Sequence, residues 1–124
     1  MARILIVEDN PANMRLACLL VERVGHLALC ATDGETGLKM AIAEHPDLIL
    51  MDIQLPGIDG LAVTALLKSD PLTASIPIIA LTALATQDDE RRTKEAGCDA
   101  YLSKPIRHSE FYALLNGLLG VPTP

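Results

Sequence analysis

Acidic residues follow two apolar runs, at points where a strand would end and a loop begin. Residues 48–51 lead straight into Asp52, and residues 4–7 lead into Glu8 and Asp9. Carboxylates gathered in a partly desolvated place repel one another, so either one is protonated or a cation is shared among them. A shared cation is the better solution. Because only oxygen ligands are on offer, a hard divalent ion, Mg²⁺ first, fits such a site.

A hydroxyl and a lysine follow two later apolar runs. Thr82 comes after residues 76–81, and Lys104 comes before Pro105 and after residues 99–103. A magnesium ion flanked by a lysine and a hydroxyl can hold a phosphoryl group, whose oxygens need positive charge and donors. An aspartate in such a site can attack activated phosphorus and form an aspartyl phosphate.

These residue types predict a role for each member of the group. We expect Asp52 to be the phosphoacceptor, because it lies between Asp9 and the side that carries the hydroxyl and the lysine. Asp9 and Asp52 are predicted as direct metal ligands and Glu8 as a water-mediated one. The backbone carbonyl of Gln54 would complete the set. Singly, each residue is ordinary at the start of a loop; jointly, they indicate a site.

The elements that must position these residues alternate along the chain. Apolar runs predict strands at residues 4–7, 27–31, 48–52, 76–81 and 99–103. Helices are predicted from Pro11 to near Val24, from Gly60 to Ser69, over 86–95, and over 111–119. One more helix is predicted between the turn at Asp33-Gly34 and His45. The expected apolar positions are 17, 20, 21 and 24 in the first helix, 38 and 40–42 in the second, 61, 62, 65 and 66 in the third, and 111, 114, 115, 118 and 119 in the last.

Strict alternation of strand and helix with short links predicts an α/β fold. Such a chain forms a parallel five-stranded sheet with right-handed crossovers and helices on both faces, a three-layer α/β/α sandwich. The carboxyl ends of all strands then lie on one rim, which brings the acids, the hydroxyl and the lysine together. The helix over 86–95 has almost nothing to bury, so we expect it to be weakly held.

Composition narrows the function classes. With 124 residues and 50% hydrophobic content, the chain suits one domain and leaves no room for a second. The net charge is −6 and no basic stripe is present, which argues against nucleic-acid binding. No segment reaches the ~20 apolar residues of a membrane span, and no signal peptide is evident. We therefore expect a soluble, cytoplasmic protein.

Cysteines and histidines are scattered. Cys18, Cys30 and Cys98 lack metal-site spacing and are predicted to be buried thiols rather than a disulfide framework or a zinc site. His26, His45 and His108 do not cluster, and we expect them at the surface.

Four stretches together resemble the response-regulator receiver domain (CheY-like). They are Glu8-Asp9-Asn10, Asp52 with Pro56-Gly57-Ile58-Asp59-Gly60, Leu81-Thr82-Ala83 and Ser103-Lys104-Pro105. The resemblance covers nearly the whole chain. It implies a flavodoxin-like fold with strand order 2-1-3-4-5, a receiver over residues 1–120, a short tail over 121–124, and no output domain.

The resemblance also implies a reaction and a partner. A phosphohistidine on a sensor histidine kinase or a histidine phosphotransfer protein would phosphorylate Asp52 in a Mg²⁺-dependent step. Thr82 and Tyr101 would act as switch residues, moving the face formed by the fourth strand, the following helix and the fifth strand. The Lys104–Pro105 peptide would be cis. Such a protein is not an enzyme beyond its own phosphorylation and dephosphorylation, and its downstream target is a protein that the sequence does not name.

Residues 51–56 and 96–101 look most like DivK-like single-domain regulators, although receivers inside hybrid kinases share them. Leu84 departs from this group, in which an aromatic residue is expected. With Gln54 it would flank the path of hydrolytic water, which leaves the lifetime of the phosphorylated state open.

Other functions remain open on the same fold. The chain could be a phosphorylation-independent docking module or a receiver fragment of a larger hybrid kinase, and Tyr101 also fits an ordinary half-buried strand position. A haloacid-dehalogenase-type phosphatase requires a second acid two residues after its nucleophile. That position holds Gln54, which counts against this function. A flavin carrier would not place Glu8 and Asp9 beside its phosphate.

Overall fold

The computed structural model describes residues 1–83 and 86–120, and within these ranges strands and helices alternate as the sequence predicts. The elements are β1 (Arg3–Val7), α1 (Pro11–Arg23), β2 (Leu27–Ala31), α2 (Gly34–Glu44), β3 (Leu48–Asp52), α3 (Gly60–Ser69), β4 (Ile78–Thr82), α4 (Gln87–Ala96), β5 (Ala100–Ser103) and α5 (His108–Leu119). Leu84, which is predicted to flank the path of hydrolytic water, and the predicted tail over 121–124 lie outside the described residues.

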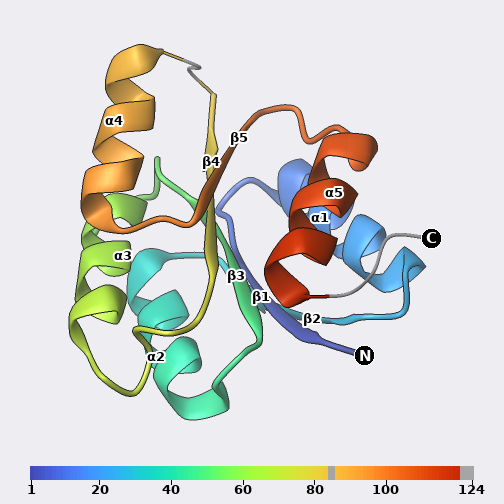
Figure 1. Cartoon of the computed structure of the whole chain (residues 1–124), viewed down its shortest axis with the longest axis horizontal. Helices are drawn as coiled ribbons and strands as arrows, with labels where there is room; N and C mark the ends of the chain where they lie inside the picture. Colours follow the sequence, from blue (N-terminus) through green and yellow to red (C-terminus); the bar gives the residue numbers. More distant parts are fainter. Residues whose placement is uncertain (84–85, 121–124) are drawn as a thin grey trace.

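The sheet is parallel throughout, with strand order β2-β1-β3-β4-β5 (Figure 1). This confirms the predicted fold class and strand order. All five residues of β3 and all five of β4 are buried, because helices cover both faces of these central strands. β2 and β5 are the edge strands and are more exposed.

Two apolar cores lie on opposite faces of the sheet. On one face, α1 and α5 pack against side chains that include Ile6 and Leu50. On the other face, α2 and α3 pack against residues that include Leu5 and Met51. Figure 1 shows this arrangement, with α1 and α5 on the right of the sheet and α2, α3 and α4 on the left. The last helix buries its predicted side, since Phe111 and Leu115 are fully buried.

Side-chain caps fix the starts of most helices, and with them the loops that carry the site. A side-chain oxygen at the N-cap accepts a hydrogen bond from the backbone N–H three residues later, which satisfies an otherwise unpaired donor. This occurs in α1, α2, α3 and α4, with Asn10, Asp33, Asp59 and Thr86 as caps. The predicted Asn10 cap and Pro11 start of the first helix are confirmed.

The predicted apolar side of α3 is wrong. The helix buries Gly60, Val63, Thr64 and Leu67, whereas Leu66, expected inside, is 47% exposed. Gly60 explains the difference, because a Cβ atom there would lie 2.0 Å from the carbonyl oxygen of Asp52. The helix makes its closest approach to β3 at a residue without a side chain, and the positions three, four and seven residues later share that face.

Several boundaries and single positions also differ from the predictions. β4 begins at Ile78, since Pro77 has no N–H for the ladder, although the Pro77 carbonyl still accepts from Ile49 N at 2.9 Å. β5 begins after Asp99, whose carboxylate accepts from Ile78 N. Val24 is the exposed C-cap of α1 rather than part of its buried side. In α2 the predicted Ile42 is 42% exposed, while Ala41 is buried.

The prediction of buried thiols is wrong for Cys30. Its side chain is exposed, because β2 is an edge strand only partly covered by α1, and Cys18 and Cys98 are half-buried. Of the histidines, His45 and His108 are exposed as predicted. His26 is half-buried, and its Nδ1 accepts a hydrogen bond from Ala2 N at 2.9 Å.

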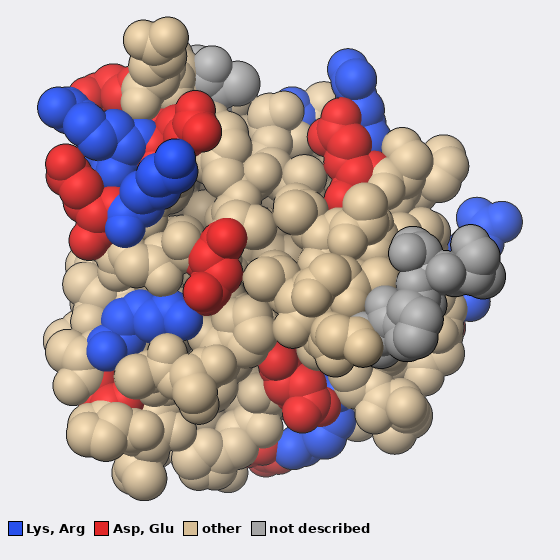
Figure 2. All heavy atoms as spheres, in the orientation of Figure 1, with Lys and Arg blue, Asp and Glu red and all other residues tan. Residues whose placement is uncertain are grey.

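The small buried side predicted for α4 is confirmed. Thr93 is the buried residue of this helix. Figure 2 shows basic and acidic side chains interleaved over α4, at the upper left of the molecule. Acids occupy its first turn and Lys94 its last, an order that suits the helix dipole but provides little apolar contact. Across the described part of the chain, no helix is long and apolar enough to cross a membrane.

Candidate functional site

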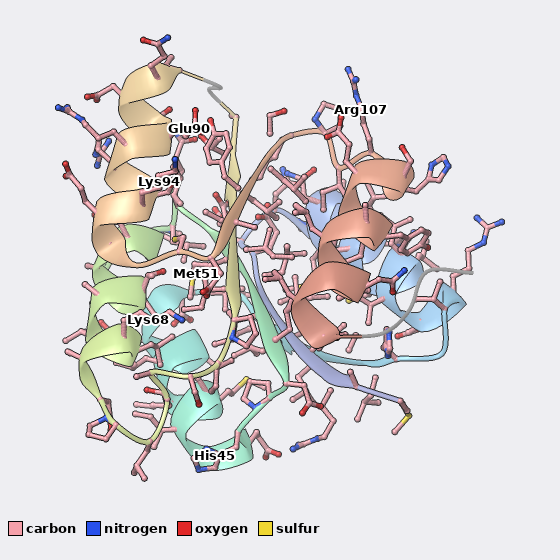
Figure 3. All side chains as sticks on the ribbon, viewed as in Figure 1. His45, Met51, Lys68, Glu90, Lys94 and Arg107 are labelled. Carbon is pink, nitrogen blue, oxygen red and sulfur yellow. The ribbon has the colours of Figure 1, made fainter. Side chains whose placement is uncertain are left out.

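The acidic residues meet because β1 and β3 are neighbours in the sheet. Val7 pairs with Met51, so the residues that follow each strand leave the sheet at the same rim. A backbone hydrogen bond from Glu8 N to Ala31 O, 3.0 Å long, holds the first of them against β2. Figure 3 labels Met51, which lies inside the molecule and precedes Asp52.

Three carboxyl groups form one cluster at this rim. Glu8, Asp9 and Asp52 each offer an oxygen, and these atoms all lie within 4.8 Å of one another. Glu8 is 1% exposed and Asp52 is 2% exposed, whereas Asp9 is open to solvent. The three acids predicted as metal ligands are therefore brought together, and the exposed one leaves the cluster accessible.

Lys104 places its ammonium group against two of these acids. Its Nζ lies 2.9 Å from Asp52 Oδ2 and 3.1 Å from Glu8 Oε2. The sequence predicts that Asp52 lies between Asp9 and the side of the site that carries this lysine. In the structure it pairs with the acids directly, because they are buried and need a cation nearby. The Lys104–Pro105 peptide is cis, as the resemblance implies.

The charges in the cluster shift one another's titration. Burial raises the pKa of Glu8, and the neighbouring Asp52 raises it further, while Asn13 and Lys104 oppose the shift. Burial alone would lower the pKa of Lys104, but its contacts with Asp52 and Glu8 prevail and raise that pKa. The lysine is therefore held in its charged form, and Glu8 is the acid whose ionisation the fold opposes.

Asn13 belongs to the site although it was not predicted from the sequence. Its side-chain amide donates a hydrogen bond of 3.1 Å to Glu8 Oε1 from the first turn of α1. Asn10 caps that helix and so fixes the orientation of this turn. The available signal was the spacing: a helix starting directly behind the acids must direct part of its first turn toward them.

The loop after β3 holds the other oxygen of Asp52. Gln54 N donates to Asp52 Oδ1 at 2.9 Å, so the two carboxylate oxygens have different partners, an amide and an ammonium. The loop then returns to Gly60, which packs against the Asp52 backbone. The predicted role of the Gln54 carbonyl as a metal ligand stays a prediction.

The predicted switch residues come from β4 and β5. Thr82 is fully buried at the end of β4, and its carbonyl accepts a hydrogen bond of 2.7 Å from Lys104 N. Tyr101 is half-buried in β5 and lines a surface hollow with Thr93 and Lys94. Burial, with Asp89 and Glu90 of α4, raises the pKa of Tyr101. In Figure 3, Lys94 and Glu90 extend from α4 on the side that faces β5.

Comparison with known proteins gives the family. The sequence model of the family described as the response regulator receiver domain matches residues 4–116. The polar-differentiation response regulator DivK of Brucella ovis is 46% identical over 117 residues, which cover 94% of this chain and 95% of DivK. The chain belongs to the response regulator receiver family.

Solved receivers share the whole fold. The receiver domain of a sensor histidine kinase from Pseudomonas aeruginosa, described with a magnesium ion coordinated in its active-site cleft, is 34% identical with a TM-score of 0.90, covering 96% of this chain and 98% of that one. The receiver domain of a histidine kinase from Syntrophus aciditrophicus is 31% identical with a TM-score of 0.89, covering 97% and 91%.

The donor set of this receiver fits a hard divalent cation. All three side chains of the cluster are carboxylates, which suit Mg²⁺, Mn²⁺ or Ca²⁺ rather than a metal that prefers nitrogen or sulfur. The exposed Asp9 leaves room for the waters that Mg²⁺ keeps. The acidic site can therefore hold a metal beside the buried Asp52 carboxylate.

Proposed function

We propose that this receiver accepts a phosphoryl group on Asp52 in a Mg²⁺-dependent reaction, from a phosphohistidine of a histidine kinase or phosphotransfer protein. The arrangement of Asp52 supports this proposal. Its carboxylate is almost fully buried, yet it belongs to an accessible acidic cluster, and Lys104 and the Gln54 amide fix its two oxygens. A fixed nucleophile beside positive charge is what phosphoryl transfer requires.

In the proposed step, an Asp52 oxygen forms a bond to phosphorus as the bond from phosphorus to the histidine nitrogen breaks. The imidazole leaves with the electron pair of that bond and takes up a proton. A bound Mg²⁺, held by Asp9 and Asp52 directly and by Glu8 through water, would neutralise charge on the phosphoryl oxygens. Lys104 and the Thr82 hydroxyl would donate hydrogen bonds to those oxygens.

The proposed output is a change at the face formed by β4, α4 and β5. Thr82 would turn toward the phosphoryl group and Tyr101 would rotate inward, shifting α4. The single buried residue of α4 supports this choice, since a helix with few buried contacts costs little free energy to move. The protein would then act as a signalling module that modifies only itself. Its downstream protein target and its predicted cytoplasmic location stay predictions.

Phosphorylation of the full chain by a small phosphodonor tests this function. With Mg²⁺ and acetyl phosphate, mass spectrometry should show one added phosphoryl group, which is lost in Asp52→Asn and without divalent cation. Asp59→Asn is the matched control, because Asp59 is an exposed acid in the same loop and asparagine caps a helix equally well. Labelling that survives in Asp52→Asn, or no labelling of the unchanged protein, would refute the proposal.

A further inference from the structure

Two cysteines face each other on the surface between α1 and β2. The Sγ atoms of Cys18 and Cys30 lie 3.2 Å apart, in contact but not bonded. Cys18 is half-buried and Cys30 is exposed, so a small reagent can reach the pair from solvent through Cys30. This pair lies outside the acidic site and has no part in the phosphorylation proposed above.

The fold itself sets this contact. Cys30 pairs with Ile6 in the parallel register of β1 and β2, and Ile6 belongs to the core on the α1 face of the sheet. Successive side chains of every strand alternate between the two faces of the sheet, so residues that are register partners point to the same face. Cys30 therefore lies on the same face as Ile6. On α1, Cys18 lies one turn after Met14, and both residues pack at the margin of the same core. Backbone pairing and helix packing therefore bring the two thiols together.

We propose that Cys18 and Cys30 are a peroxide-reactive thiol pair that forms a reversible disulfide linking α1 to β2. The sulfur atoms must approach by about 1.2 Å to reach the 2.03–2.05 Å of a disulfide, a movement that small side-chain rotations can supply. In a reducing compartment such bonds are typically transient and redox-sensing. The oxidant named here is a hydroperoxide.

The reaction balances as two successive displacements. The Cys30 sulfur attacks a peroxide oxygen, the O–O bond breaks, and one water leaves once the released hydroxide takes a proton, so Cys30 becomes a sulfenic acid. The Cys18 sulfur then attacks the Cys30 sulfur, its proton passes to the departing hydroxide, and a second water leaves. Two thiols lose two electrons and form one disulfide, while hydrogen peroxide is reduced to two waters.

The environments of the two thiols give each a distinct part. Burial raises the pKa of Cys18 to about 12, with further contributions from Cys30 and Glu22, so this thiol stays protonated in the reduced protein. Cys30 is the exposed member and therefore meets the peroxide first. Cys18 is already in contact with it, so this thiol needs to give up its proton only as it attacks, and it resolves the sulfenic acid before a second peroxide can oxidise it further.

The third cysteine provides a matched control. Cys98 packs against the core on the opposite face of the sheet and lies 4.0 Å from the Thr64 hydroxyl. It cannot reach either member of the pair without unfolding. Cys98→Ser should therefore remove a thiol from the protein without changing the reaction.

The experiment treats the reduced full chain, and its Cys98→Ser variant, with hydrogen peroxide and maps the products by mass spectrometry after tryptic digestion. We expect both proteins to lose two hydrogen atoms and to give a cross-link between peptides 16–23 and 24–39, reversed by dithiothreitol. The closed loop should raise the melting temperature by roughly 5 to 15 °C. Cys18→Ser should instead accumulate Cys30 oxidised to sulfenic or sulfinic acid as a monomer.

Other products would overturn the proposal. If the unchanged protein forms dimers linked through Cys30, or if its Cys30 becomes over-oxidised, Cys18 does not resolve the intermediate. Loss of the cross-link in Cys98→Ser would show that the wrong pair had been assigned. Circular dichroism of each reduced variant establishes that it is folded before oxidation, and a folded Cys18→Ser protein that still forms an intramolecular bond would also contradict it.

Discussion

Replacing Lys104 by methionine removes the ammonium group that separates two buried acids. The variant keeps a side chain of similar length but leaves Glu8 and Asp52 without the contacts of 3.1 and 2.9 Å. Removing one partner of a buried ion pair typically costs about 3 to 5 kcal/mol, because the remaining charge stays desolvated. Proton uptake by Glu8 limits the part of this loss that comes from that acid.

The size of the Glu8 part follows from the ordinary glutamate pKa of 4.5. Keeping Glu8 protonated at pH 7 costs about 3.4 kcal/mol at about 1.36 kcal/mol per unit of pKa. We therefore expect Lys104→Met to lower the free energy of unfolding by about 3 kcal/mol at pH 7 without divalent cation. A carboxyl group whose folded pKa is raised binds more protons folded than unfolded, so the loss should shrink as pH falls toward 4.5.

Urea denaturation with chelator, repeated between about pH 5 and pH 7 and then with Mg²⁺, measures this loss. Mg²⁺ should recover part of the stability, because a bound cation replaces the missing charge. Lys68→Met is the control: its side chain is 19% exposed against 18% for Lys104, but its ammonium binds the exposed Asp99 and two backbone carbonyls, those of Ala74 and Ile76, instead of buried acids. If both variants lose stability equally at every pH and Mg²⁺ rescues neither, the electrostatic account of the cluster is refuted.

Three smaller changes test the supports of the site. Gly60→Ala should destabilise the protein by about 2 kcal/mol or more because its Cβ would meet the Asp52 carbonyl, whereas Gly117→Ala, with open space around it, should stabilise α5 by up to about 1 kcal/mol in urea denaturation. Thr86→Ala should remove the α4 cap at a cost of about 1 kcal/mol and speed amide exchange in α4, with Thr86→Ser as control. Glu8→Gln should stabilise the metal-free protein, because the fold raises the pKa of this acid, yet weaken Mg²⁺ binding in calorimetry roughly tenfold.

The sheet and the acidic rim were predictable because they depend on local patterns that all point the same way. An apolar run such as residues 48–51 is compatible with little else than a buried strand, and parallel strands must deliver their ends to one rim. This rule predicts, without any measured distance, that Asp9, Asp52 and Lys104 lie close together. The order of the strands came from family resemblance, since alternation alone allows several orders.

Contacts made across the chain were not predictable in the same way. The buried side of α3 is set by the close approach of Gly60 to β3, and a helix that is apolar around most of its circumference gives no periodic signal to choose a face. The Asn13 contact with Glu8 depends on where the first turn of α1 points. The pairing of Cys18 with Cys30 depends on strand register, which one sequence does not specify.

The site and the proposed output face place opposite demands on stability, and the fold meets them in neighbouring elements. Asp52 ends a strand that is paired on both sides and fully buried, so its carboxylate has little freedom to yield when charge is added. Thr82, one strand further, joins this rigid part to Lys104 through its carbonyl. Beyond it, β5 is paired on one side only, and α4 buries Thr93 alone among its described residues. A change in charge at Asp52 therefore costs least free energy when it is accommodated at β5 and α4, so the response should be directed to that face by differences in packing rather than by a dedicated path of contacts.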